Sequence, residues 1–160
     1  MVNDNAYFAS LPKKYMGSGL LVRDSSGAVL IVTPTYKPKL EIPGGVVEAN
    51  ESPRDCAQRE SLEELGLELT PQRLLVMNYL SASDDRPDAL MFVFDGGVLK
   101  PDDIARIHSP PSELEAWQFV PPPKLPVLLL PRMVRRLQCA LDVLEAGETW
   151  YLEDGAKTHP

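Results

Sequence analysis

The apolar positions in the first part of the chain form short runs separated by polar turn residues, a pattern that predicts strands. Residues 16–22 and 28–33 are two such runs, and the polar segment 24–27, Asp-Ser-Ser-Gly, separates them. Aliphatic runs bounded by turn residues are typical of strands, and a short polar turn between two of them is typical of a hairpin. The sequence therefore predicts a β-hairpin, which a loop at residues 34–38 connects to a short extended segment at residues 40–42.

The second half of the chain carries further strand patterns. Residues 74–80 and 89–94 are apolar runs joined by the polar loop SASDDRPD, and residues 113–120 alternate between apolar and polar positions. We expect three strands here, and the polar loop between the first two is of the kind that often carries specificity. Residues 100–108 predict a short helical turn.

A helical spacing of apolar side chains predicts a helix near the end of the chain, from about residue 131 to residue 146. The apolar side chains that recur three and four residues apart are Met133, Leu137, Ala140, Leu141 and Leu144. Such a stripe is expected to face a core. We interpret Met133 and Cys139 as packing residues, and we expect the segment after Gly147 to be a frayed or interface-forming tail.

A second helix is predicted at residues 53–65, and its two ends are marked in the sequence. Ser52 can cap the N-terminus through its side-chain oxygen, and Pro53 suits the first helical position. Asp55 favours the positive end of the helix dipole. Gly66 suits the position just past the C-terminus, where the backbone often becomes left-handed.

One face of this helix is acidic and the other is expected to face the core. At 100° per residue, Glu60, Glu63 and Glu64 fall on one arc, beside Arg59 and Cys56. The residues of the opposite arc are Ala57, Ser61, Leu62 and Leu65. Like charges three or four residues apart each destabilise a helix by roughly 0.2–0.5 kcal/mol, so the carboxylates need an offsetting charge. Arg59 can neutralise one of them, and the remainder form an oxygen-rich environment that suits Mg²⁺ or Mn²⁺.

The composition limits the fold class and the partners. At 160 residues, 44% of them hydrophobic, the chain fits one compact α/β domain, which we place at residues 15–147 between an N-terminal arm, 1–14, and a C-terminal tail, 148–160. The net charge of −7 and the pI near 4.8 argue against a nucleic acid or an anionic membrane surface as the main partner. No apolar run approaches the roughly 18 residues of a membrane span. Cys56 and Cys139 fit two free thiols in a reducing cytoplasm.

The spacing of glycines, carboxylates and one arginine around the predicted helix resembles the signature of the Nudix hydrolases. The matching positions are Gly45, Glu51, Arg59-Glu60, Glu63-Glu64 and Gly66-Leu67. The glycines, the glutamates and the arginine among them are seven fixed identities, and seven identities at fixed offsets arise by chance with a probability of about 10⁻⁸. Pro43-Gly44 also fits the approach to this box, where we interpret the two adjacent glycines as a turn. A surface helix that is merely rich in glutamate would not explain the positions of the glycines and of Glu51.

Two positions depart from the family pattern, and neither is a carboxylate. Ser61 stands where the family usually has a bulky aliphatic residue, and we expect its hydroxyl to bond back to the carbonyl of residue 57. Asn50 stands where the family often has glycine, and asparagine tolerates a left-handed backbone better than most residues.

The resemblance implies a fold, a cofactor and a set of functional residues. The family fold is an α/β/α sandwich with a mixed curved sheet and the box helix on one face. The implied ligands for Mg²⁺, or for Mn²⁺, are Glu60, Glu63, Glu64 and the backbone carbonyl of Gly44. By the same resemblance, Arg59 holds the carboxylates by ion pairing and Glu51 assists through metal or water contacts. The implied general base is Glu63 or Glu113.

Basic and aromatic side chains outside the box are candidates for substrate binding. Those that precede it are Arg23, Tyr36, Lys37 and Lys39, and Arg86 lies in the polar loop between two predicted strands. A basic side chain can hold a phosphate and an aromatic ring can stack on a base, although for each residue alone solvent exposure is the commoner fate. The preferred phosphate ligands among them are Lys39 and Arg23.

The function that the resemblance implies is divalent-metal-dependent hydrolysis of a diphosphate linkage in a nucleoside diphosphate derivative or nucleoside triphosphate, by attack of water at phosphorus. The expected partner is a small-molecule diphosphate, a nucleotide, and neither a nucleic acid nor a membrane; a homodimer is left open. The alternative is a non-catalytic nucleotide-binding or sensor module on the same fold. Degenerate boxes mark such modules, whereas this box keeps all its carboxylates.

Overall fold

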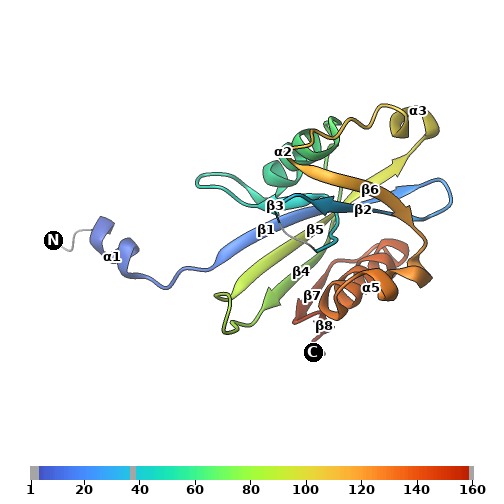
Figure 1. The fold of residues 1–160 in the computed structure, drawn as a ribbon. Helices are drawn as coiled ribbons and strands as arrows, with labels where there is room; N and C mark the ends of the chain where they lie inside the picture. Colours follow the sequence, from blue (N-terminus) through green and yellow to red (C-terminus); the bar gives the residue numbers. More distant parts are fainter. Residues whose placement is uncertain (1–3, 37–38, 159–160) are drawn as a thin grey trace.

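A computed structural model describes residues 4–36 and 39–158, which form one mixed β-sheet with helices on its two faces (Figure 1). The sheet has eight strands in the order β6-β2-β1-β5-β4-β7-β8, and β3 pairs with β1 outside this path. The strands are β1 (Tyr15–Asp24), β2 (Val29–Pro34), β3 (Gly44–Val46), β4 (Leu74–Leu80), β5 (Ala89–Leu99), β6 (Leu114–Val120), β7 (Trp150–Glu153) and β8 (Ala156–Lys157). Lys37 and Pro38, in the loop expected before the box, lie outside the described residues.

Helices cover both faces of this sheet. The helices are α1 (Asp4–Ser10), α2 (Pro53–Leu65), α3 (Pro101–Ile104), α4 (Leu125–Leu128) and α5 (Pro131–Ala146), with a 3₁₀ turn, η1, at Pro122–Lys124. Figure 1 shows α2 on one side of the sheet and α5 on the other. The strand pairs β1–β5 and β4–β7 are parallel, whereas β1–β2, β2–β6 and β4–β5 are antiparallel. The predicted α/β/α sandwich with a mixed sheet is therefore confirmed. Within the described residues, no helix is long and apolar enough to cross a membrane.

Two apolar cores lie on the two faces of the sheet. Along β1, the side chain of Leu21 belongs to the core beneath α5, while Leu20 and Val22 belong to the core beneath α2. Successive side chains of a strand point to opposite faces, so a strand covered on both faces is apolar at consecutive positions. This explains why β1 and β2 appear in the sequence as unbroken apolar runs.

Helix α2 begins and ends at the residues that the sequence predicts. Ser52 accepts a hydrogen bond from the backbone N–H of Asp55 at 3.1 Å. Gly66 adopts a left-handed φ of 66° and donates its N–H to the carbonyl of Leu62. Because both caps are local interactions, the sequence alone defines the ends of the helix. Helix α5 also has the bounds expected from its apolar spacing.

Two side chains of α2 differ from the prediction. Leu62 was expected to face the core, but it is 50% exposed, and the helix packs through Ala57 and Leu65 instead. Ser61 is fully buried and donates to the carbonyl of Gln58 at 2.7 Å rather than to that of residue 57. Its oxygen also accepts from the N–H of Leu69 at 3.0 Å. The hydroxyl therefore secures the chain that leaves the helix, which explains a polar residue at a buried position.

Gly44 and Gly45, at the start of the box, lie in strand β3 and not in the predicted turn. Strand β3 pairs with β1 so that Gly45 lies opposite Ser18 and Gly44 lies opposite Gly19. Gly44 has a φ of 151°, and a Cβ at this position would overlap the backbone of β1 at Ser18. Glycine is therefore required for the close approach of the two strands. Asn50 adopts the expected left-handed backbone, with a φ of 64°.

The other strand predictions are confirmed with changes in length. Strand β5 was expected to end at residue 94 and continues to Leu99. The extended segment expected at residues 40–42 contains a single bridge, between Glu41 and Val32. The proline-rich segment before α5 forms η1 and α4, neither of which the sequence pattern predicted.

The segment expected to be a C-terminal tail contains strands β7 and β8. Strand β7 pairs in parallel with β4, with Tyr151 opposite Met77, and Leu152 is fully buried in the core beneath α5. The chain after Gly147 is therefore part of the sheet, which corrects the expectation of a frayed end. At the other end of the chain, Figure 1 shows α1 apart from the sheet, and Tyr7 and Phe8 are exposed.

Candidate active site

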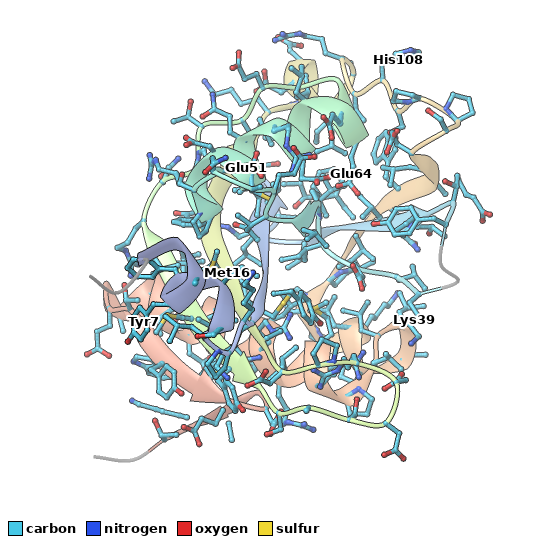
Figure 2. All side chains as sticks on the ribbon, turned by 90° about the vertical axis from the view of Figure 1, so that its left-hand side faces the viewer. Tyr7, Met16, Lys39, Glu51, Glu64 and His108 are labelled. Atoms are coloured by element: carbon cyan, nitrogen blue, oxygen red, sulfur yellow. The ribbon has the colours of Figure 1, made fainter. Side chains whose placement is uncertain are left out.

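Glu64 is the buried carboxylate at the centre of the box. It lies on the face of α2 that is turned toward β3, it is 3% exposed, and it accepts a hydrogen bond from the backbone N–H of Gly44 at 2.9 Å. Burial raises the pKa of Glu64 to about 8, and the neighbouring carboxylates of Glu60, Glu41 and Glu113 add to this shift. Figure 2 shows Glu51 and Glu64 beside one another near α2, with Lys39 below Glu64 and His108 at the outer edge of the molecule.

Glu60 lies one turn before Glu64 and is packed against β3. A Cβ on Gly45 would overlap the carboxylate of Glu60, so the absence of a side chain at Gly45 provides the space that this carboxylate occupies. Burial raises the pKa of Glu60, whereas the guanidinium of Arg59 opposes the shift. Two neighbouring carboxylates with raised pKa values mark a site where negative charge is concentrated and poorly hydrated.

Arg59 holds three carboxylates of the box at once. Its Nε donates to Glu51 at 2.8 Å, and its Nη1 donates to Glu60 and to Glu63, each at 2.9 Å. Its Nη2 also donates to the carbonyl of Val46 in β3 at 3.2 Å. These bonds raise the pKa of Arg59 and, with the N–H of Glu48, lower the pKa of Glu51 to about 2. The predicted ion-pairing contacts of Arg59 are therefore present.

The chemistry of this site fits a hard divalent cation. The acidic side chains around α2 and β3 present oxygen donors only, as Mg²⁺ and Mn²⁺ prefer. In the part of the chain that the structure describes, no three histidine, cysteine or acidic residues are grouped as a metal cluster. Arg59 accounts for this, since its guanidinium draws Glu60 and Glu63 toward itself while Glu64 is bonded to Gly44. A cation would offset the burial and the nearby negative charges that raise the pKa values of Glu60 and Glu64.

Glu113 comes from outside the box but lies close to it. It directly precedes β6, where its backbone carbonyl accepts from the N–H of Thr35 at 3.1 Å. Its charge contributes to the raised pKa values of both Glu60 and Glu64. The charge of Glu113 therefore acts on the box carboxylates from a different element of the fold.

A cavity of about 270 Å³ adjoins the box and contains three of the five candidate substrate-binding residues, of which Lys37 lies outside the described residues. It lies between β1, β3, β5 and α5, and Gly44 and Gly45 form part of its wall. Tyr36, Lys39 and Arg86 also line it. The fold brings these three side chains to one place from two loops that are far apart in the sequence.

Arg23, the fourth predicted substrate ligand, does not line this cavity. Its guanidinium forms an ion pair with Asp95 on the neighbouring strand β5, at 3.0 Å, and both side chains are mostly buried. This arrangement does not support its assignment as a preferred phosphate ligand, because the guanidinium is already paired with a carboxylate of the neighbouring strand.

Several residues of the cavity wall were not predicted from the sequence, and three of them bear on its chemistry. They are Ser18 of β1 and Arg132 and Arg136 of α5. A signal for Arg136 was available, because it lies three residues after Met133 and four before Ala140, on the apolar stripe of the predicted helix. A charged residue on such a stripe is rarely buried without a partner, so it indicates a functional role.

Gly45→Ala is expected to raise the Mg²⁺ concentration required for half-maximal turnover by about tenfold or more, because the added methyl group displaces the carboxylate of Glu60. The free energy of unfolding in EDTA should change little, since the displaced group is the end of a flexible side chain. A metal titration of turnover, together with urea unfolding, measures both quantities. An unaltered Mg²⁺ requirement would mean that Glu60 has no part in metal binding.

Comparisons with known proteins agree with this geometry. The NUDIX domain family matches residues 13–141. The fold is similar to that of the MutT protein from Methanosarcina mazei Go1, with a TM-score of 0.68 and 22% identity over 88% of this chain and 100% of that chain. It is also similar to a UDP-X diphosphatase, with a TM-score of 0.72 and 16% identity over 95% of this chain and 75% of that chain. An Ap4A hydrolase from C. elegans has a TM-score of 0.62 and 19% identity over 84% of this chain and 99% of that chain.

No curated protein sequence matches the chain. The family match nevertheless spans most of the 160 residues, and the residues of the box lie together around α2 and β3 in the arrangement described above. The chain belongs to the Nudix hydrolase family.

Proposed function

We propose that the protein hydrolyses a phosphoanhydride bond in a nucleoside diphosphate derivative or nucleoside triphosphate, with Mg²⁺ or Mn²⁺ as cofactor. The observation that carries the proposal is the buried carboxylate of Glu64 beside that of Glu60, both with raised pKa values. Buried acidic groups of this kind are costly without a counter-charge, and a divalent cation supplies one. Among the similar structures, the UDP-X diphosphatase and the Ap4A hydrolase are named for nucleotide derivatives, which supports a nucleotide substrate.

Four groups of the box would hold the cation: the carboxylates of Glu60, Glu63 and Glu64 and the carbonyl of Gly44. When bound, Mg²⁺ neutralises charge on a diphosphate and lowers the pKa of a coordinated water. Arg59 orients the ligand carboxylates, and Glu51 in turn anchors Arg59 through two bonds, at 2.8 and 3.1 Å. Lys39 and Arg86 face the cavity next to the box, where their charges suit the phosphates of a substrate.

Glu113 is our preferred general base for the attacking water, with Glu63 as the alternative. The carboxylate of Glu63 accepts a hydrogen bond from the guanidinium of Arg59 at 2.9 Å, so it is already engaged within the box. Glu113 lies close to both Glu60 and Glu64, as their pKa shifts indicate. Glu113→Gln should therefore lower kcat by about 10²-fold, and Glu63→Gln should lower it less. If Glu63→Gln lowers kcat more than Glu113→Gln does, the role of general base belongs to Glu63.

A panel of nucleoside diphosphate derivatives and nucleoside triphosphates tests the proposed function. Each compound is incubated with the protein in Mg²⁺, in Mn²⁺ and in EDTA, and the phosphorus-containing products are identified by ³¹P NMR. We expect cleavage of at least one compound at an anhydride bond, with no cleavage in EDTA. Tight binding of one nucleotide without cleavage of any compound would favour the alternative, a binding or sensor module.

A further inference from the structure

Arg136 of α5 is a buried cation without an acidic partner in the described chain. It is 4% exposed, and its side chain lines the cavity that adjoins the box. Its Nε has no hydrogen-bond partner, and the contact of its Nη1 is with the sulfur of Met133 at 4.0 Å, a weak acceptor. No carboxylate of the described residues forms an ion pair with it.

This arrangement is unfavourable for the protein alone. Burial lowers the pKa of Arg136 to about 10, so the guanidinium is still charged at neutral pH. Burying a charge with so few hydrogen bonds is unfavourable, because the donors of a guanidinium normally find acceptors. A side chain with this cost and no structural partner is expected where it binds a ligand, because strained or unsatisfied groups are concentrated at functional sites.

The other basic side chains that line the cavity make the surroundings of Arg136 positive. Arg86, Arg132 and Lys39 line the same cavity, and the charges of Arg86 and Arg132 both lower the pKa of Arg136. Arg86 comes from the loop between β4 and β5, and its Nε is also buried without a hydrogen-bond partner. Glu41 lines the cavity as well, and its charge acts in the opposite direction. Four basic groups thus outnumber the single carboxylate of the wall.

The wall next to the box carries a second polar group without a partner. Ser18 is 3% exposed, lines the cavity, and lies opposite Gly45 in the pairing of β1 with β3. Its hydroxyl oxygen has no hydrogen-bond partner. The cavity therefore offers a hydroxyl on the side of the box and guanidinium groups on the side of α5, which suits a polar ligand that spans the space between them.

The size of the cavity limits that ligand. Pockets for drug-sized molecules usually measure about 300–1,000 Å³, and this one measures about 270 Å³. A sugar with one phosphate group suits such a volume better than a second nucleoside does. Guanidinium groups bind phosphate oxygens through paired hydrogen bonds, which favours a phosphate over a neutral sugar.

We propose that this cavity binds a phosphate monoester carried by the substrate, separate from the anhydride that is hydrolysed, and that Arg136 is its principal ligand, assisted by Arg86 and Arg132. The substrate class is then a diphosphate whose sugar portion bears a further phosphate group. The inference rests on the proposed function only in treating the cavity as part of the substrate site.

The first test measures binding without turnover. Ribose 5-phosphate, ribose and AMP are titrated into the protein in EDTA by calorimetry. We expect ribose 5-phosphate to bind, ribose not to bind, and AMP to bind more weakly because of its size. Arg136→Met should weaken the binding of ribose 5-phosphate by about tenfold to a hundredfold, as the loss of charge-assisted hydrogen bonds requires.

Arg135→Met is the matched control. It removes the same charge from the adjacent position of α5, but Arg135 is exposed and donates to the backbone carbonyl of Asp154 at 3.0 Å. The affinity of the Arg135→Met variant for ribose 5-phosphate should stay within about twofold of wild type, since an exposed charge is screened by solvent. Equal losses in Arg135→Met and Arg136→Met, or no loss in Arg136→Met, would overturn the proposal.

Thermal unfolding without ligand separates a binding role from a structural one. Replacing an unpaired buried cation by an apolar side chain of similar length is expected to keep or raise the unfolding temperature. A marked fall for Arg136→Met would show that Arg136 is needed for the fold and would contradict its assignment as a ligand. If that variant is not recovered, Arg86→Gln, on a half-buried loop residue, provides the binding test, and unchanged affinity there would also count against the proposal.

A second measurement keeps this inference distinct from the proposed function. Pairs of nucleoside diphosphate sugars that differ only in a phosphate monoester on the sugar are compared as substrates. We expect Arg136→Met to raise KM for the phosphorylated member by about tenfold or more and to leave its KM for the other member unchanged. Turnover with no preference between the two members would refute the phosphate site but not the hydrolase. Binding of ribose 5-phosphate through Arg136 without any turnover would refute the hydrolase but not the phosphate site.

Discussion

Glu64→Gln is expected to lower kcat by about 10³-fold or more while the fold stays intact. The amide has nearly the same shape as the carboxylate, and its carbonyl oxygen can still accept from the N–H of Gly44. The amide has no negative charge, so it cannot balance the charge of a divalent cation as the carboxylate would. Steady-state turnover of the best substrate from the panel, at saturating Mg²⁺, measures the loss.

The control for this variant is Glu68→Gln, the same change four residues further along the chain. Glu68 is exposed and accepts from the side chain of Gln58 at 3.0 Å, away from the cavity and β3. Its turnover should match that of wild type. Undiminished turnover in Glu64→Gln, or an equal loss in both variants, would remove Glu64 from its assigned role.

In the absence of metal, Glu64→Gln is expected to be more stable than wild type at pH 8, by up to about 5 kcal/mol. The pKa of Glu64 is about 8 in the folded protein and 4.5 in its ordinary state, so the folded form binds more protons between these values. The contribution of Glu64 to the stability of wild type therefore falls as the pH rises from about 4.5 to 8. The glutamine variant does not titrate at this position and lacks this part of the decline.

Urea unfolding in EDTA at pH 5, 6, 7 and 8 measures this difference. The two proteins should have similar free energies of unfolding at pH 5 and diverge as the pH rises. Adding Mg²⁺ at pH 8 should stabilise wild type more than the variant, because a ligand that binds the folded state alone shifts the unfolding equilibrium. Parallel stability curves for the two proteins would show that the carboxylate of Glu64 is not held in an unfavourable environment.

The parts of the fold that local interactions define could be predicted from the sequence. Ser52 and Gly66 each bond to residues within the same helix, so the bounds of α2 needed no tertiary information. The apolar spacing of α5 was equally sufficient, since one continuous stripe faces the core. The positions of β1 and β2 along the chain followed from apolar runs that are unbroken because both faces of these strands are covered.

The parts that the sequence did not predict depend on contacts between distant segments. Strand β7 forms because β4 offers it a parallel edge, and such a pairing has no local turn to indicate it. Gly44 and Gly45 resemble turn residues, yet they are needed because β1 and Glu60 approach them closely. Arg23 and Arg86 are both basic residues near strand ends, and only the fold shows that one pairs with Asp95 while the other lines the cavity.

The measurement that tests the proposed function most directly is hydrolysis in ¹⁸O-labelled water, in Mg²⁺ and in EDTA, with wild type and Glu64→Gln. Mass spectrometry of the products shows where the oxygen of water is added. We predict that one labelled oxygen appears on a phosphate for each bond broken by wild type in Mg²⁺, and that neither EDTA nor the variant gives labelled product at a comparable rate. Labelled oxygen in a hydroxyl group bonded to carbon, or turnover that persists in EDTA, would contradict metal-dependent attack of water at phosphorus.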